Sequence, residues 1–308
     1  MAKATREAYG KVLQELIVED EKIIVLDADL TKSTKTADAK KACPARHYNM
    51  GIAEGNEMSV AAGFAASGFT VFASTFSMFA TGRAWEQVRN SICYPNLNVK
   101  VCGTHAGISV GEDGASHQAI EDIALMRAIP KMRVYQPSDA YQTEAIIRHV
   151  AKENGPCYVR LGRGKVDDVY NENTKFEIGK INVLNKGKKV AIFATGLLVQ
   201  EALKAKEELL KDNINPTIID VSCLKPLDDE GVLEIFKSHD VIVSAEEHNI
   251  IGGLGSALAD VATSKYPIKI TRIGINDTFG ESGPANELLE KYGLCSNNII
   301  KVVKNLMQ

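Results

Sequence analysis

Four short segments of this sequence bring together residue types that can do chemistry. The densest spans residues 105–118 (HAGISVGEDGASHQ) and holds two histidines, two acids and three glycines within fourteen residues. Histidine exchanges protons near neutral pH, and a connecting loop this rich in titratable groups usually carries function. His105 and His117, with one acid near them, do not have a recognisable metal-ligand spacing. We therefore expect catalysis or binding in this loop and no metal site on the chain.

Two further segments place acidic residues just before or within predicted helices. Residues 27–33 (DADLTKS) directly follow an apolar run, and they could bind an anionic ligand or simply cap the next helix. Glu54 begins a helical pattern that is otherwise lined with apolar residues such as Met58 and Phe64. A glutamate in a first turn often interacts only with the helix dipole, whereas an apolar pocket would raise its pKa and make it a proton donor. From the residues alone, both interpretations stay open for both segments.

The fourth segment contains Phe76 and Phe79, which are three positions apart and would share a helix face. Aromatic pairs at this spacing belong more often to a core than to a platform for a flat ligand ring.

A fifth, weaker pattern is the glycine-rich turn at 252–255, which follows Glu246, Glu247 and His248. Such a turn can bind an anion at a helix N-terminus. It lacks the full dinucleotide-binding spacing, so we interpret it as a structural turn.

Alternating strand and helix patterns must position these segments. Thr5 is a plausible N-cap for a first helix. Strands are predicted at 23–26, 70–73, 98–103, 133–136 and 157–161, and helices at 54–66, 76–92 and 140–151. The 70–73 strand should break at Ser74. Such alternation predicts an α/β fold, with a mostly parallel sheet covered by helices on both faces. Ligands bind beyond the carboxyl ends of parallel strands, which is where the four segments stand.

The pattern changes between about residues 164 and 188, where Asp, Asn, Lys and Glu predominate. A second strand–helix series follows, with strands at 190–194, 217–221, 241–244 and 268–273 and helices at 199–211, after Asp228 and at 255–263. We therefore predict two doubly wound, mostly parallel-sheet domains, at 1–165 and 189–308, joined by a linker at 166–188.

Composition narrows the classes of function. The 308 residues are 45% hydrophobic and 24% charged, as in globular proteins, and the net charge of −3 provides no basic field for nucleic acid or a membrane surface. The six cysteines are scattered without a Cys-x-x-Cys pair. Met1 is followed by a charged amphipathic stretch and no run of about 18 apolar residues exists, so we expect a cytoplasmic protein.

In this order, the segments resemble the C-terminal portion of transketolase, which consists of the pyrimidine-binding domain and the last domain. The resemblance covers essentially the whole chain. The most specific match is Gly-Glu-Asp-Gly-x-x-His-Gln at 111–118, supported by Ala-Thr-Arg at 4–6, Ala-Asp-Leu-Thr at 28–31 and Ser-Thr-Phe at 74–76. The related deoxyxylulose-phosphate synthases usually lack the glutamate of the first motif.

The resemblance implies thiamine diphosphate as the cofactor. Glu54 resembles the glutamate that hydrogen-bonds the pyrimidine ring and favours its imino form, whose nitrogen can take the proton of the thiazolium carbon. Phe76 and Phe79 resemble the aromatic wall on which that ring stacks, and Leu30 would support the bent shape of the cofactor. Asp29 matches a position near the cofactor and the subunit contact.

The resemblance also implies a substrate site. His105, Asp113 and His117 resemble the residues that contact the sugar: the histidines would hold donor hydroxyls and move protons, and Asp113 would recognise a hydroxyl. With Glu54, these two histidines are the expected catalytic residues. Arg6, Ser33, His105 and Arg163 resemble the clamp around the sugar phosphate, for which arginine is suited by its bidentate hydrogen bonds.

Two departures from the family pattern matter. Gly82 stands where many transketolases have a further aromatic residue. More importantly, the 308 residues contain no Gly-Asp-Gly motif with a downstream metal-binding Asn, through which these enzymes bind the diphosphate and its Mg²⁺ or Ca²⁺. The resemblance therefore implies a partner, an N-terminal transketolase subunit that carries this site, in a two-plus-two heterotetramer acting on sugar phosphates.

Alternatives remain. The chain could belong to another two-chain thiamine-diphosphate enzyme, such as one like deoxyxylulose-phosphate synthase, a dehydrogenase, or a transketolase for an unusual sugar. The intact loop at 111–118 argues against the first two, but it does not exclude an altered sugar. A non-catalytic dimerisation or regulatory module is the remaining alternative, and the combination of Glu54, two phenylalanines and two loop histidines argues against it.

Overall fold

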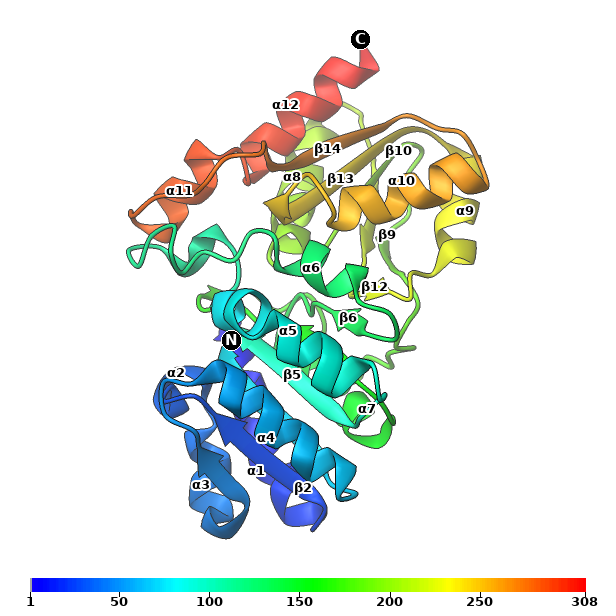
Figure 1. Cartoon of the computed structure of the whole chain (residues 1–308). Helices are drawn as coiled ribbons and strands as arrows, with labels where there is room; N and C mark the ends of the chain where they lie inside the picture. The colour runs from blue at the N-terminus through cyan, green and yellow to red at the C-terminus, as the bar shows by residue number, and fades with distance from the viewer. Residues whose placement is uncertain (1) are drawn as a thin grey trace.

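The computed structural model describes residues 2–308, which form two sheets and one short strand pair (Figure 1). The larger sheet has seven strands in the order β12-β6-β7-β5-β4-β2-β3, and only β12 runs antiparallel to its neighbour. These strands are β2 (Ile23–Asp27), β3 (His47–Asn49), β4 (Thr70–Phe76), β5 (Val99–Thr104), β6 (Arg133–Tyr135), β7 (Cys157–Arg160) and β12 (Cys223–Lys225). Every residue of β2, β4 and β5 is buried, which matches this arrangement, because parallel strands are covered on both faces.

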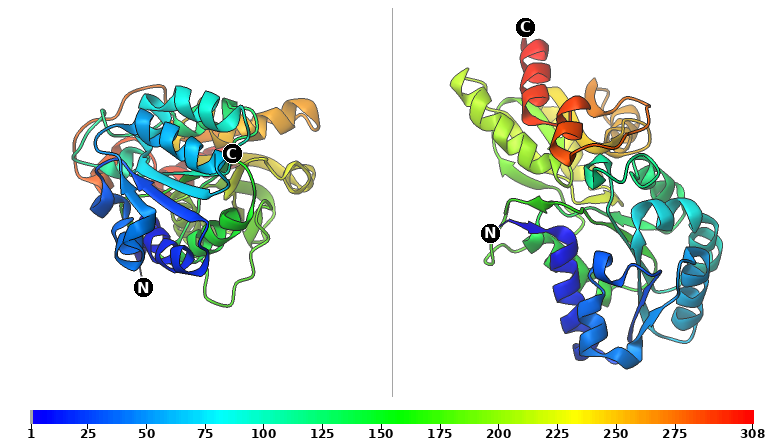
Figure 2. Two further views of the ribbon diagram at one scale, coloured as in Figure 1. Left: turned by 60° about the horizontal axis from the view of Figure 1, so that its bottom comes forward. Right: turned by 90° about the vertical axis from the view of Figure 1, so that its left-hand side faces the viewer.

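Helices cover both faces of this sheet, as the two views in Figure 2 show. One face packs against α1 (Thr5–Glu19), α3 (Ala37–Ala42) and α7 (Ala140–Lys152). The other packs against α4 (Glu54–Ala66), α6 (Asp122–Ala128) and the run of η2 (Phe79–Arg83), α5 (Trp85–Gln87) and η3 (Val88–Cys93). Short elements complete this part: α2 (Thr31–Thr34), η1 (Pro44–Arg46) and η4 (Ile108–Val110).

The second sheet has five strands in the order β14-β13-β10-β11-β9, of which only β9 is antiparallel. They are β9 (Asn182–Asn185), β10 (Lys189–Ala194), β11 (Thr217–Asp220), β13 (His239–Asn249) and β14 (Ile270–Ile275). Helices α8 (Leu198–Lys211) and α12 (Ser296–Met307) pack on one face and α9 (Asp229–Ser238) and α10 (Leu254–Ser264) on the other, while α11 (Ala285–Lys291) lies beside η4. The expected class, two doubly wound α/β domains, is confirmed.

The two parts share more structure than the sequence indicated. Strand β12 leaves the second half of the chain to pair with β6, and one apolar cluster continues from Met58 in α4 to Leu258 in α10. The segment predicted as a linker contains β9, which joins the second sheet, and it begins within β8 (Lys165–Val166), which pairs with β1 (Lys3–Ala4). The exact division into 1–165, 166–188 and 189–308 stays a prediction.

Two local predictions were wrong. Thr5 is the first residue of α1 and Ala4 is its N-cap, while the Thr5 hydroxyl instead accepts a hydrogen bond from the Gly162 N–H at 2.8 Å. Strand β4 does not break at Ser74 but continues to Phe76, so Phe76 and Phe79 do not share a helix. The sequence pattern did not predict this continuation because Ser74 and Thr75 are polar. Both are nevertheless buried in the strand, where Ser74 hydrogen-bonds Glu57 and Tyr9.

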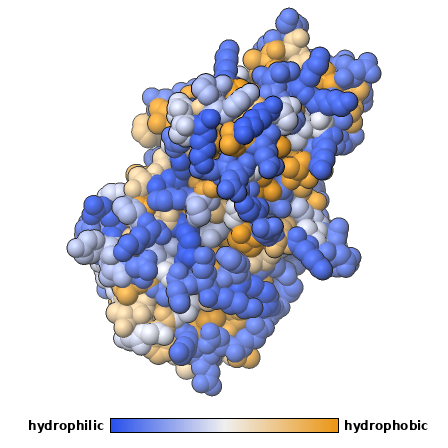
Figure 3. Space-filling model, turned by 90° about the vertical axis from the view of Figure 1, so that its right-hand side faces the viewer, coloured by the Kyte–Doolittle hydropathy of each residue, from blue (hydrophilic) through white to orange (hydrophobic). Residues whose placement is uncertain are grey.

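No helix within residues 2–308 is long and apolar enough to cross a membrane. On the side shown in Figure 3, hydrophilic residues predominate and apolar residues form separate patches.

Candidate active site

The segments singled out in the sequence meet at one edge of the seven-stranded sheet. Parallel strands end on the same side, and β2, β4, β5 and β7 are followed there by the loops that carry the expected site residues. Arg6 and Glu54 stand in the first turns of α1 and α4, two helices that pack on this sheet. The architecture thus explains why residues up to 157 positions apart can contact each other.

Glu54 is the first residue of α4 and is almost completely buried. Its Oε2 accepts a hydrogen bond from Nη1 of Arg83 at 2.8 Å, and the Arg83 guanidinium also lies over the ring of Phe79, 4.6 Å from its centroid. Phe79 and Phe76 stack on each other with centroids 5.9 Å apart and planes 15° apart. The Glu54 carboxyl group therefore stands beside the aromatic wall of Phe76 and Phe79. Arg83, whose side chain is 54% exposed, contacts both Glu54 and Phe79.

Arg83 is a residue that the sequence analysis missed. It stands four positions after Phe79 and next to Gly82, the position expected to thin the aromatic wall. In η2 it reaches back over the Phe79 ring, where it covers a face that a flat ligand ring could occupy. The i+4 spacing from Phe79 was the available signal.

The loop at 105–118 places both histidines against the aromatic wall. The His105 ring stacks on Phe76 with centroids 3.9 Å apart, and His117 meets Phe79 edge-on at 5.3 Å. His105 is buried, and its backbone has a φ of +57°, in the left-handed region, which marks a sharp turn directly after β5. Burial, together with the charges of Arg6 and Arg163, lowers the pKa of His105 to about 3. His105 is therefore a neutral imidazole.

The four residues expected to form the phosphate clamp are brought together. Arg6 donates from Nε to the Arg163 carbonyl at 3.2 Å and from Nη1 to the Ser33 carbonyl at 2.8 Å. The same Nη1 lies 3.4 Å from Nε2 of His105. Arg163 also hydrogen-bonds the Val110 carbonyl and faces two acids of the loop, Glu112 at 3.3 Å and Asp113 at 4.0 Å. Two guanidinium groups and one imidazole thus converge, with Asp113 exposed at their edge.

Asp29 and Leu30 lie along a different rim. They line a hollow with Ser33 and residues of α3, and the Asp29 N–H donates to Oδ1 of Asn49 at 3.0 Å. The loop that carries them is held by buried Asp27, which accepts hydrogen bonds from Thr31 and Thr36 and contacts Nε2 of His47 at 2.8 Å. A contact of Asp29 or Leu30 with a cofactor stays a prediction.

The second half of the chain holds the loop at 105–118 from behind. Gln118 donates from Nε2 to the carbonyls of Ile108, Gly111 and Glu281, and Oε1 of Glu247 accepts from the Ser109 N–H at 2.6 Å. A Cβ on Gly107, whose φ is +82°, would lie 2.3 Å from the Glu247 carboxyl group, so this approach requires glycine. The loop is therefore shaped by both parts of the chain.

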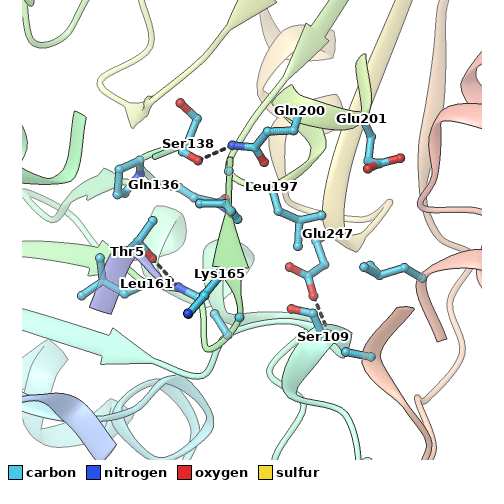
Figure 4. A pocket seen from close by; sticks show the side chains of 18 of the residues that line it. Thr5, Ser109, Gln136, Ser138, Leu161, Lys165, Leu197, Gln200, Glu201 and Glu247 are labelled. Atoms are coloured by element: carbon cyan, nitrogen blue, oxygen red, sulfur yellow. Dashed lines mark hydrogen bonds between the residues drawn. The ribbon is translucent and has the colours of Figure 1, made fainter. Parts of the chain in front are cut away.

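Behind the loop, a cavity of about 200 Å³ lies between the first and second parts of the chain (Figure 4). Thr5 and Ser109 line it from the first part, and Gly196, Gln200 and Glu247 from the second. The turn at 252–255 lies elsewhere: both oxygens of Glu246 accept from the N–H groups of Leu254 and Gly255, which supports its interpretation as structural.

Comparison with known proteins agrees with this geometry. The profile of the transketolase pyrimidine binding domain matches residues 1–168, and that of the transketolase C-terminal domain matches residues 179–299. A solved structure described as a split gene transketolase, inactive beta4 tetramer, superposes with a TM-score of 0.90 at 50% identity, covering 99% of this chain and 98% of that one.

Relatives differ in how much of their length the chain covers. A Methanocaldococcus jannaschii protein named as a transketolase C-terminal section is 50% identical over 99% of this chain and 97% of its own length. The 6-deoxy-6-sulfo-D-fructose transketolase subunit SqwH of a Clostridium species is 38% identical over 98% of this chain and 94% of its own length. Human transketolase is 36% identical over 99% of this chain but only 49% of its own length. The chain belongs to the transketolase family and corresponds to its C-terminal section, the pyrimidine-binding domain followed by the C-terminal domain.

Proposed function

We propose that this chain is the C-terminal subunit of a thiamine-diphosphate-dependent transketolase, which transfers a two-carbon ketol unit from a ketose phosphate to an aldose phosphate. The observation that carries the proposal is the juxtaposition of buried Glu54, the Phe76–Phe79 pair and the Arg6–His105–Arg163 cluster at one sheet edge. Glu54 and the phenylalanine pair suit a flat, nitrogen-containing ring, and the cluster that contains Arg6 and Arg163 suits a phosphate.

The cofactor, when bound, would supply the carbon nucleophile that the reaction at the ketose carbonyl requires. The residues of this chain have separate tasks. Glu54 would share a proton with the pyrimidine ring through the carboxyl oxygen that accepts the Arg83 hydrogen bond in this structure, once Arg83 has left it. Arg83 must swing away from Phe79 for a ring to stack there, and its exposed side chain is free to do so.

The neutral state of His105 suits it to accept a hydrogen bond from a substrate hydroxyl. His117, half-exposed at the edge of Phe79, is the second candidate for this role, and Asp113 stands at the entrance to recognise a hydroxyl. Arg6 and Arg163 hold the sugar phosphate by charge-assisted hydrogen bonds.

The proposal includes a partner. Because the 308 residues contain no Gly-Asp-Gly motif, the diphosphate and its Mg²⁺ or Ca²⁺ would bind to a separate N-terminal subunit, and two copies of each subunit would form the enzyme. The similarity to a split-gene transketolase whose tetramer of one subunit type is inactive supports this arrangement.

The decisive experiment is reconstitution. The purified chain is assayed for ketol transfer with thiamine diphosphate, Mg²⁺ and sugar phosphates, first alone and then with the N-terminal subunit. We expect turnover only in the mixture. Full turnover by the chain alone, or none with an N-terminal subunit that forms a stable complex, would contradict the proposal.

A second candidate is a transketolase for a sulfonated sugar, which the 38% identity to the SqwH subunit favours. A sulfonate and a phosphate both carry negative charge on tetrahedral oxygens, so the arginine clamp alone does not decide between them. Comparing kcat/KM for fructose 6-phosphate and 6-deoxy-6-sulfofructose in the reconstituted enzyme discriminates between the two functions.

A further inference from the structure

Helix α4 carries a second buried carboxyl group, Glu57, one turn after Glu54. Its side chain is 0% exposed, although a glutamate is rarely buried so completely without a cation. Positions three apart on a helix are neighbours, so the two carboxyl groups lie on adjacent turns of the same face. Neither the cofactor role of Glu54 nor the aromatic wall accounts for this second acid.

Glu57 connects α4 to the end of β4. Its Oε1 accepts a hydrogen bond from the Ser74 N–H at 2.8 Å, while Oε2 is buried without a hydrogen-bond partner among the described residues. Ser74 stands two residues before Phe76, the innermost ring of the aromatic wall. The contact therefore fixes the helix that begins with Glu54 relative to the strand that ends with Phe76.

The surroundings of Glu57 favour its neutral form. Burial is the largest of the causes that together raise its pKa to about 8; the Ser74 hydrogen bond acts in the opposite direction, and the nearby carboxyl groups of Asp27 and Glu54 act in the same direction as burial. Asp27 is the acid that faces Glu57 from β2, and its Oδ2 is bonded to Nε2 of His47. Among the residues that the structure describes, no cation forms an ion pair with Glu57.

The remaining neighbours are uncharged. From α1, the Tyr9 hydroxyl bonds Oγ of Ser74 at 2.7 Å, and from β5 the thiol of Cys102 faces the same space. Burial raises the pKa of both groups well above its usual range, so neither carries a charge near neutral pH. Within residues 2–308, the titratable groups that interact with Glu57 are thus the acids Asp27 and Glu54 and the uncharged Tyr9 and Cys102, with the His47 ring bonded to Asp27.

We propose that Glu57 is a positioning residue that acts as a neutral carboxylic acid: it holds the start of α4 against the carboxyl end of β4 and so places Glu54 against the aromatic wall. Ionisation of Glu57 sets a negative charge one turn from Glu54 and opposes transfer of the Glu54 proton to a bound ring. The first part concerns the fold of this chain, and the second rests on the proposed transketolase function.

The first test uses the isolated chain and its Glu57→Gln variant, which keeps the shape of the neutral acid. The folded-state pKa of Glu57 is raised, so the folded chain holds a proton that the unfolded chain releases above about pH 4.5. Wild-type stability relative to the variant is therefore greatest below pH 4.5 and is lost as the pH rises towards 8. We expect the ratio of folded to unfolded wild-type chain, relative to the variant, to fall by up to about tenfold per pH unit in this window.

Parallel stability curves for the two chains between pH 5 and 9 would overturn the assignment of a neutral acid. If Glu57→Gln does not fold, the wild-type chain labelled with ¹³C at the glutamate carboxyl carbons gives the same information by NMR. We expect a buried glutamate that titrates near pH 8, and titration of every glutamate below pH 6 would contradict the proposal.

The second test follows the contact itself. The amide of Ser74 should be protected from hydrogen exchange at pH 7 in the wild-type chain and in Glu57→Gln, whose amide oxygen still accepts its hydrogen bond, and should exchange faster in Glu57→Leu, which removes the acceptor. Equal protection of Ser74 in wild type and Glu57→Leu would overturn the positioning role without reference to any enzyme activity.

The third test uses the reconstituted enzyme. Wild-type turnover should fall on the alkaline side through about pH 8, and this limb should be absent in Glu57→Gln. Coincident pH profiles would reject the effect on Glu54. If Ser74 exchange behaves as expected but no sugar is turned over, the proposed function fails while the positioning of α4 by Glu57 stands.

Discussion

Nε2 of His105 faces Nη1 of Arg6 at a distance of 3.4 Å. Arginine stays protonated at all ordinary pH values, so a proton on this imidazole would place two positive charges side by side. Together with burial, which contributes most, this lowers the pKa of His105 to about 3. The first prediction is therefore that His105 remains neutral over the whole working range of the enzyme.

The pH dependence of stability should show this. Between about pH 6.5 and 3, the unfolded chain binds a proton on His105 that the folded chain does not, so this residue destabilises the fold as the pH falls. In His105→Gln, denaturant unfolding should therefore show a shallower loss of stability below pH 6.5 than in wild type. His149→Gln, in the half-exposed part of α7, is the matched control. A His105 ring that titrates above pH 6 by NMR would contradict the prediction.

The second prediction concerns Glu54. Its carboxyl group can share a proton with a bound ring, whereas the amide of Glu54→Gln cannot, so the reconstituted enzyme should lose about 10²–10⁴-fold in turnover. Glu86→Gln, on an exposed surface of α5, should leave turnover within about twofold of wild type, since surface changes have small effects. Steady-state kinetics measure both variants, and unchanged turnover of Glu54→Gln would remove its catalytic assignment.

The third prediction tests the clamp. Arg163→Ala should lose about 1.5–3 kcal/mol of recognition of a phosphorylated sugar, the usual value of a hydrogen bond to a charged group. The loss should be visible as a higher KM for the phosphorylated ketose and should be much smaller for the unphosphorylated one. Arg148→Ala removes an arginine from the other end of the first part, where it pairs with Glu15 and Glu19, and is the control. An equal KM increase for both sugars would show that Arg163 only shapes the loop through Val110.

The fourth prediction concerns the support of the loop by the second part of the chain. Gln118→Leu leaves the carbonyl of Glu281 without its donor and removes one of the two donors to the carbonyls of Ile108 and Gly111; an unsatisfied buried group costs about 1–3 kcal/mol. Unfolding of the isolated chain should show a loss in this range, and KM for the sugar should rise. Gln14→Leu on the exposed side of α1 provides the control. Unchanged stability and KM would mean that the loop keeps its shape without Gln118.

Much of the fold was readable in local patterns. The helix that begins with Glu54 and the strand–helix alternation after residue 189 were both predicted correctly, because apolar periodicity reflects which side of an element is buried. The position of the site segments after β2, β4 and β5 followed from the same alternation. Strand β4 was cut short because Ser74 and Thr75, polar yet buried, interrupt the apolar run.

The amino-acid sequence by itself determined the α/β class and the family, and it predicted the candidate site residues apart from Arg83, because these depend on spacings within short segments. Only the tertiary structure decided which of those residues meet. The contacts of Arg83 with Glu54, of Glu57 with Ser74 and of Gln118 with Glu281 join positions 29, 17 and 163 apart. Packing of the whole chain sets such distances, and no local periodicity encodes them.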